Sequence, residues 1–133
     1  MKTTIYVEPV GKARPRVVGG GVAYTPQKTA DSEALIRMSI LGNMGYFDRD
    51  VPLRLVATFY RERPKSLKKN IVFPVSRPDL DNYLKLLTDA LEKYIYHNDS
   101  QIVTAVVHKR FGTPPRIELE IYEDVEVSFP FGG

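Results

Sequence analysis

The stretch of residues 77–85 most constrains what this chain can form, because it joins an extended segment to a helix and carries two acids and a lysine. Pro78 disfavours helical backbone at the residue before it and can itself start a helix, so we expect an extended approach that turns into a helix. Asp79 and Asp81 then lie at the helix start, and Lys85 follows Asp81 by about one turn on the same face. These side chains predict one local site.

The two acids at this helix start have two interpretations. An Asp before an apolar helix is a good N-cap, and a carboxylate is favourable beside the positive end of the helix dipole. A helix start needs only one cap, however, and close carboxylates repel unless a cation joins them, so the pair favours a metal site. A helix that begins at or after Asp81 would let the carboxylates of Asp79 and Asp81 converge on that ion. Capping stays open as the alternative.

The composition is that of an ordinary folded protein. Its 133 residues are enough for one hydrophobic core, and 43% apolar with 26% charged residues is typical of a globular domain. The absence of cysteine excludes disulfides and cysteine-bound zinc. No signal-peptide pattern and no apolar run of membrane-spanning length is present, so we expect a cytoplasmic protein without a membrane partner.

The formal net charge of +3 is small, but basic residues gather in three stretches that contain no acid, 9–30, 63–78 and 108–116. Because these stretches flank the acidic cluster, the pattern favours a polyanion whose phosphates meet Lys and Arg on both sides of a metal site. A solvated basic surface is the alternative for any single stretch. The residues that we expect to contact nucleic acid are Lys12, Arg14, Arg16, Lys65, Lys68, Lys69, Arg77, Lys109 and Arg110.

Hydrophobic periodicity predicts, in order, a strand, a helix, a second strand, a second helix and a hairpin. The expected bounds are 3–10, 26–44, 51–61 and 81–94, followed by paired strands at 101–111 and 116–122. Residues 16–18 and 22–24 can also pair across three consecutive glycines, and the long connection 63–77 predicts a functional loop. Together these elements predict one α/β (α+β) domain over residues 1–133, with a mixed sheet packed against two main helices. Residues 124–133 are expected to form a loose tail or an interface strap.

Two motifs resemble the RusA family of Holliday-junction resolvases, many of which are encoded by phages or prophages. The first runs from Arg77 to Lys85, and the second runs from His97 to Ile102 after a helical spacer and leads into a strand. The resemblance covers most of the chain and includes the basic segment from Gly11 to Arg16. It implies a RusA-like fold in a small homodimeric endonuclease, which uses Mg²⁺ or Mn²⁺ to cut four-way DNA junctions.

Carried over residue by residue, the resemblance makes Asp79, Asp81 and Asp99 the catalytic acids and metal ligands, and Lys85 the catalytic basic residue. The alternative for Lys85 is an ion pair with Asp81 or Asp89 on the helix surface. This chain departs from the pattern at Asn98, where relatives often have a second acid, so we interpret Asn98 as a turn residue. Pro78 also replaces a basic residue found in some relatives, which leaves Arg77 as the nearby candidate for a phosphate contact.

The chemistry of phosphodiester cleavage agrees with this resemblance. The reaction needs an activated water, in-line geometry and neutralisation of developing charge, and Mg²⁺ on carboxylates can supply each of them. We therefore predict a Mg²⁺-dependent, structure-selective DNA endonuclease, with Mn²⁺ as the alternative ion and no small-molecule cofactor. It would resolve Holliday junctions by paired nicking, in recombination and repair, as a homodimer whose two-fold symmetry matches that of the junction. A nuclease for other branched DNA and a non-catalytic nucleic-acid-binding module are the alternative functions.

Overall fold

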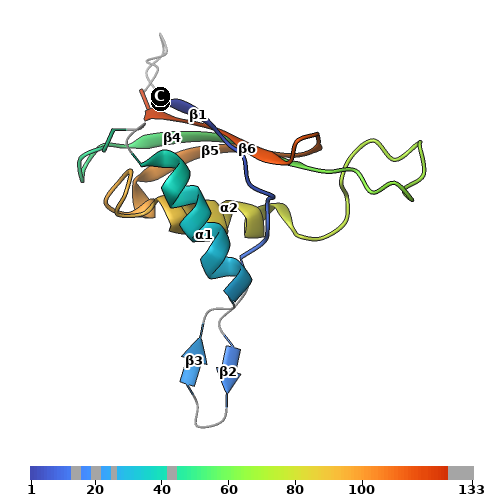
Figure 1. Cartoon of the computed structure of the whole chain (residues 1–133). Helices are drawn as coiled ribbons and strands as arrows, with labels where there is room; N and C mark the ends of the chain where they lie inside the picture. Colours follow the sequence, from blue (N-terminus) through green and yellow to red (C-terminus); the bar gives the residue numbers. More distant parts are fainter. Residues whose placement is uncertain (13–15, 19–21, 25–26, 42–44, 126–133) are drawn as a thin grey trace.

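The computed structural model describes residues 1–12, 16–18, 22–24, 27–41 and 45–125. A four-stranded sheet lies over two helices, which confirms the expected mixed α+β fold (Figure 1). The strands are β1 (Lys2–Ile5), β4 (Leu53–Arg61), β5 (Ile102–Phe111) and β6 (Arg116–Glu123) in the main sheet, with β2 (Arg16–Val18) and β3 (Val22–Tyr24) in a separate pair. The helices are α1 (Gln27–Ile40), α2 (Leu80–Leu91) and the short 3₁₀ helix η1 (Asp99–Gln101).

The sheet has the strand order β1-β6-β4-β5, with β4 and β5 parallel and the other neighbours antiparallel. Along β4, Leu53, Leu55, Ala57 and Phe59 are buried while the residues between them are partly exposed. This alternation gives the sheet one apolar face, because successive side chains of a strand point to opposite faces. The two helices cover that face, and α2 forms the crossover that parallel strands require.

The expected hairpin between residues 101–111 and 116–122 is wrong, because β4 lies between these two strands. The chain crosses the end of β4 at Gly112, whose N–H donates a hydrogen bond to the carbonyl of Arg61 at 3.0 Å. A Cβ atom at Gly112 would lie 2.5 Å from Cδ1 of Tyr60, so the crossing depends on the absence of a side chain. Both β4 and β6 therefore have a neighbouring strand on each edge, and β1 and β5 form the edges of the sheet.

Both main helices are shorter than their periodic patterns predict. Helix α2 begins at Leu80, one residue before the expected start, and ends at Leu91 instead of Tyr94. The next residues leave helical geometry, since Glu92 is extended and Lys93 has a φ of 72°, which ends the helix in the left-handed region. The Tyr94 side chain is therefore 46% exposed and lies under the Arg37 guanidinium, outside the apolar stripe to which its spacing assigned it.

The small sheet confirms the expected pairing of residues 16–18 with 22–24, in the register Arg16 with Tyr24 and Val18 with Val22. This pair extends downward from the N-terminal end of α1, while the 62–78 connection extends to the right of the sheet (Figure 1). β1 is only four residues long, because the chain turns after Ile5. In this turn the N–H of Val7 donates a hydrogen bond to the carbonyl of Ile5. Most of the expected tail, 126–133, lies outside the described residues.

Candidate active site

The backbone of Asp79 is fixed by the first turn of α2. It is the N-cap residue of α2, with an extended backbone, and its carbonyl accepts the N–H groups of Asn82 and Tyr83 at 3.1 and 3.2 Å. Its side chain, however, makes no capping hydrogen bond. The carboxylate is exposed and free of the structural task that the capping interpretation gives it.

Asp81 lies in the first turn of α2, where the positive end of the helix dipole favours a carboxylate. Lys85 follows one turn later, but its ammonium faces the other way along the helix. Among the ion pairs of the described residues, Lys85 contacts Asp89 at 3.0 Å and Asp99 at 3.9 Å. Two carboxylates on that side attract the ammonium more strongly than Asp81 alone. The structure thus joins Lys85 to Asp89, one of its two alternative partners on the helix surface, and brings it close to Asp99.

Asp99 is presented by the short helix η1, which a reciprocal capping box holds in place. The side chain of Asn98 accepts the N–H of Ser100 at 2.8 Å, while the Gln101 side chain accepts the N–H groups of His97 and Asn98. Gln101 is buried and also donates to the carbonyls of Asp48 and Val51. This arrangement agrees with the interpretation of Asn98 as a turn residue, and it ties the position of Asp99 to the start of β4.

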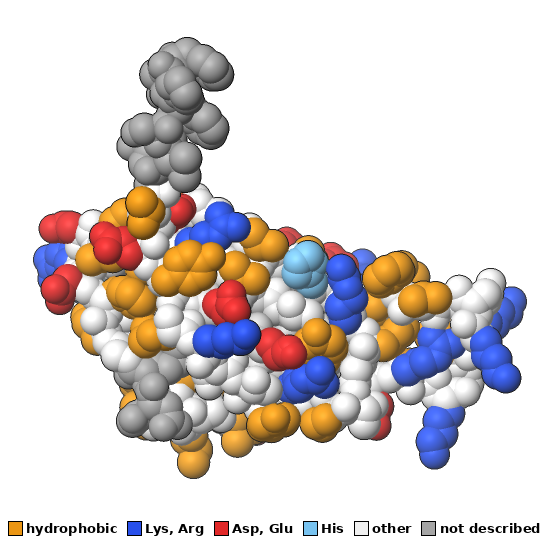
Figure 2. Space-filling view, turned by 90° about the horizontal axis from the view of Figure 1, so that it is seen from above, with side chains coloured by type: hydrophobic (Ala, Val, Ile, Leu, Met, Phe, Trp, Pro, Cys, Tyr) orange, Lys and Arg blue, Asp and Glu red, His pale blue; other side chains and the backbone are white. Residues whose placement is uncertain are grey.

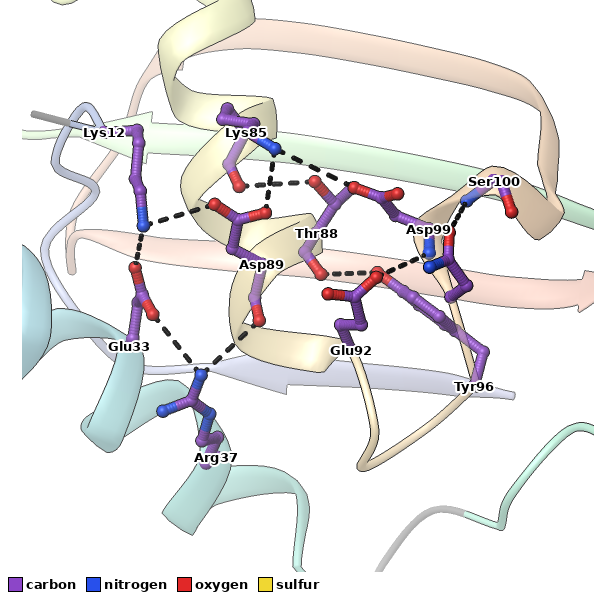
Figure 3. Close-up of polar contacts among 11 residues, drawn as sticks. Lys12, Glu33, Arg37, Lys85, Thr88, Asp89, Glu92, Tyr96, Asp99 and Ser100 are labelled. Atoms are coloured by element: carbon purple, nitrogen blue, oxygen red, sulfur yellow. Dashed lines mark hydrogen bonds and ion pairs between the residues drawn. The ribbon is translucent and has the colours of Figure 1, made fainter. Parts of the chain in front are cut away.

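A chain of ion pairs links this site to the other helix (Figure 3). One oxygen of Asp89 contacts the Lys85 ammonium at 3.0 Å, and the other contacts the Lys12 ammonium at 3.2 Å. Lys12 also contacts Glu33 of α1 at 2.6 Å, and Glu33 contacts Arg37 at 3.3 Å. The network therefore connects the segment that leads to β2 with both helices and, through Lys85, with Asp99.

The two lysines of this network, Lys12 and Lys85, both have a raised pKa. Burial lowers the pKa of Lys12, but hydrogen bonds to Glu33 and Asp89 outweigh that effect and raise the pKa above its ordinary value. The hydrogen bond to Asp89 raises the pKa of Lys85, with a further contribution from the charge of Asp99. Both side chains are therefore cationic at neutral pH. Burial likewise raises the pKa of Tyr96, whose hydroxyl donates to the carbonyl of Thr88 at 2.6 Å.

Glycine and proline let the N-terminal segment pack directly on the site. A Cβ atom at Gly11 would lie 2.8 Å from Cβ of Pro78 and 3.4 Å from that of Asn82, so a larger residue would push the two segments apart. The next N–H, that of Lys12, donates to the carbonyl of Asn82 at 3.0 Å. A cavity of about 390 Å³ opens beside this contact, with Lys28, Arg61 and Arg77 among its lining residues.

The donor chemistry at this site fits a hard divalent cation. Asp79 and Asp81 are exposed carboxylates, the ligand type that Mg²⁺ prefers, and Mg²⁺ keeps several waters and so needs few protein ligands. Within the described part of the chain, however, no three His, Asp or Glu side chains form a group that could hold an ion. The structure places Asp79 and Asp81 at one helix start and turns Asp99 toward Lys85, so the three-ligand set stays a prediction.

The residues expected to contact nucleic acid divide into two groups. Lys65, Lys68, Lys69 and Arg77 are exposed, and Figure 2 shows Lys and Arg side chains gathered on the extension that the 62–78 connection forms. The second group makes contacts within the protein. Lys12 belongs to the ion-pair network, and Lys109 donates to the carbonyls of residues 76 and 78. The Arg110 guanidinium lies over the ring of Phe73, 5.1 Å from its centroid. Arg14 and the side chain of Arg16 lie outside the described residues.

Comparison with known proteins assigns the chain to a family. Residues 7–122 match the family model described as Endodeoxyribonuclease RusA. This chain belongs to the RusA family. The predicted resemblance and the expectation of a RusA-family endodeoxyribonuclease are therefore confirmed. None of the helices in the described part of the chain is long and apolar enough to cross a membrane.

Two proteins illustrate how similar this RusA-family chain is to its relatives. Uncharacterized protein YqaN of Bacillus subtilis (strain 168) is 32% identical over 136 residues, which cover 92% of this chain and 96% of that protein. The Crossover junction endodeoxyribonuclease rusA of Lactococcus phage r1t is 42% identical over 78 residues, which cover 58% of this chain and 59% of that protein. The first relative matches nearly end to end, and the second bears a junction-cleaving name.

Sequence reasoning missed two residues around the predicted catalytic side chains of this RusA-family protein, Glu92 and Glu33. The sequence places Glu92 only on the polar face of the helix, yet it accepts the N–H of Asp99 at 3.0 Å. Asp89 is an alternative partner of Lys85 in the sequence, and the structure shows this pair at 3.0 Å. The spacing of four residues between Lys85 and Asp89 is the one signal that points to their pair. Glu33 gives no local signal, because its role depends on the packing of α1 against α2.

Proposed function

We propose that this chain is a Mg²⁺-dependent, structure-selective endonuclease that resolves four-way DNA junctions by paired nicking. Membership of the RusA family supports cleavage of DNA, and the name of the phage relative supports a junction as the substrate. The observation that carries the proposal is the pair of exposed acids at the start of α2, where Asp79 occupies the cap position without using its side chain to cap. A carboxylate left free at such a position is available to a substrate-bound cation.

Asp79, Asp81 and Asp99 would hold the Mg²⁺ or Mn²⁺ ion, which would supply an activated water and neutralise charge on the reacting phosphate. The Lys85 ammonium remains cationic because Asp89 and Asp99 raise its pKa, and at 57% exposure its side chain can meet a negatively charged oxygen. Lys85 would therefore stabilise the charge that develops as the phosphodiester bond breaks. The η1 capping box and the 3.9 Å contact between Asp99 and Lys85 support this division of roles.

The exposed cations of the 62–78 connection, with Arg14 and Arg16 of the N-terminal segment, would bind the phosphates of the junction arms. We also propose a homodimer, because two opposed strands must be cut and a two-fold pair of chains presents two identical sites. Such an enzyme would act in DNA recombination and repair, where four-way junctions form.

Cleavage of a labelled four-way junction, with and without Mg²⁺ or Mn²⁺, tests this proposal. Parallel substrates of the same sequence, a flap and a linear duplex, separate junction resolution from a nuclease for other branched DNA. We expect paired nicks in the junction only, and only with a divalent ion. Metal-independent binding with no cleavage of any substrate would leave the non-catalytic binding module as the function.

A further inference from the structure

We propose that Lys109, which sequence patterning assigns to phosphate binding, is instead a positioning residue for Asp79; this inference rests on the proposed function. Its ammonium donates to the carbonyl of Ser76 and to that of Pro78, each at 3.0 Å. A lysine ammonium has three donors, so at most one remains for any other partner. Both acceptors belong to the segment that leads directly into the helix start.

The position of Lys109 in the sheet directs it toward the helices. In the parallel pairing of β4 with β5, Lys109 lies opposite Phe59, whose ring is buried under α2 and stacks on Tyr83 with centroids 5.1 Å apart. Val107, two residues earlier on the same face of β5, packs against the core. Lys109 therefore extends from the core face of an edge strand and reaches the N-terminal end of α2.

The bond to Pro78 acts on Asp79 directly, because the carbonyl of Pro78 and the N–H of Asp79 belong to one planar peptide group. Lys109 fixes this group on one side of Asp79, and the first turn of α2 fixes the carbonyl of Asp79 on the other. Arg61, from the neighbouring strand, donates to the carbonyl of Arg77 at 2.9 Å. Three consecutive carbonyls are thus held by two cations of the sheet, and they fix the backbone from which the Asp79 side chain extends.

The two roles of Lys109 predict different results for the variant Lys109→Met, which keeps the length of the side chain and removes its charge. A positioning role predicts that the single-turnover cleavage rate at saturating enzyme falls about tenfold or more, since small misplacements of a reacting group are costly. Junction affinity and its salt dependence should then stay at the wild-type values. Lys2→Met, at the opposite edge of the sheet, is the matched control and should leave the rate, the affinity and the salt dependence unchanged.

A phosphate contact predicts the reverse. The cleavage rate at saturating enzyme would be unchanged, while the slope of log affinity against log salt would become shallower by about 0.9. That result would overturn the inference. Should Lys109→Met fail to fold, Lys109→Gln, whose amide can donate to one of the two carbonyls, is measured in the same way.

A second readout separates this inference from the proposed function. In the DNA-free protein, the amide resonance of Asp79 should shift in Lys109→Met and not in Lys2→Met, because Lys109 binds the carbonyl of the same peptide group. If the wild-type protein cuts no junction, the proposed function fails while this shift still supports the positioning role. An unchanged Asp79 resonance in Lys109→Met would overturn the inference whatever the outcome of the cleavage assay.

Discussion

At the scale of single residues, the predicted catalytic acids are distinguished by how little structural work their side chains do. Asp79 makes no cap bond, and Asp99 is held through its backbone N–H by Glu92, which leaves its carboxylate for Lys85. A residue that serves only stability would use its carboxylate to satisfy nearby donors. Replacing these acids should therefore change chemistry more than folding.

We expect Asp79→Asn, Asp81→Asn and Asp99→Asn each to abolish cleavage while retaining or improving junction binding. Each change removes a negative charge that repels phosphate and an oxygen ligand that the cation requires. Cleavage of a labelled junction and a parallel gel-shift titration measure the two effects. A folded variant at any two of these positions that cuts at a rate near that of the wild type would contradict the metal-site assignment.

Lys85→Ala should lower the cleavage rate much more than it lowers junction affinity, because one charge among many adds little to binding but acts on the transition state. Asp89→Asn, which removes a carboxylate from the Lys85 pair, should lower the rate less and in the same direction. Single-turnover kinetics and equilibrium titrations on the same junction separate rate from affinity. Equal losses in both would show that Lys85 is an ordinary phosphate contact.

The stability of the ion-pair network should depend on pH through Lys12. Its pKa is raised in the folded state above the ordinary value of 10.5, so the folded protein holds this proton more tightly than the unfolded chain does. The resulting stability is fully present below pH 10.5 and is lost as pH rises through the higher folded-state pKa. Lys12→Met should be about 1 to 3 kcal/mol less stable than the wild type at pH 9, because one oxygen of the buried Glu33 and one of the partly buried Asp89 lose their hydrogen-bond partner.

Urea unfolding between pH 9 and about 11.5 measures this difference, over a range chosen to span the ordinary lysine pKa. The gap between the wild type and Lys12→Met should narrow as the pH rises above 10.5. Lys2→Met is the control, since the Lys2 ammonium contacts Glu120 at 3.4 Å on an exposed surface where a salt bridge adds little. A gap that stays constant across this range would show that the charge of Lys12 does not support the fold.

At the scale of elements, the crossing at Gly112 gives the sheet its order. Gly112→Ala should lower the free energy of unfolding by about 1 to 3 kcal/mol, because the new Cβ would overlap the ring of Tyr60. The Arg116 guanidinium lies over this ring, 3.9 Å from its centroid, and restricts its movement. Gly45→Ala is the matched control, since its Cβ would lie 3.9 Å from Sδ of Met1, an ordinary contact. Urea denaturation measures both variants, and equal stabilities would contradict this account of the crossing.

Elements with a strong local pattern were predictable, and their long-range arrangement was not. The stripe of α2 and the alternation of β4 placed these elements to within a few residues, because each pattern reflects one buried face. The order of β4, β5 and β6 depends on which strand lies in the interior of the sheet, and the residue patterns of the single strands do not indicate this. For the same reason Asp79 and Lys85 could be predicted from their motif and Asp89 from its spacing of four residues to Lys85, whereas the role of Glu33 depends on the packing of the two helices.

At the scale of the whole molecule, one chain offers one set of predicted catalytic residues, but a junction is resolved only when two opposed strands are cut. A homodimer joins two such sites through a two-fold axis, so each site should act on one strand. Among the described strands, β5 is an edge of the main sheet, carries the exposed Val103 and directly follows η1, which contains the predicted site residue Asp99.

A mixed dimer of wild-type and Asp81→Asn chains, isolated with two different affinity tags, tests this division of labour. We expect it to nick one strand of each junction at about the wild-type rate per site and to produce few resolved products, since only one site is active. The wild-type dimer should give paired nicks, and the Asp81→Asn dimer should give none. Sedimentation measurements on the same samples establish that each is dimeric. Paired cleavage by the mixed dimer would show that one site cuts both strands and would contradict the symmetric arrangement.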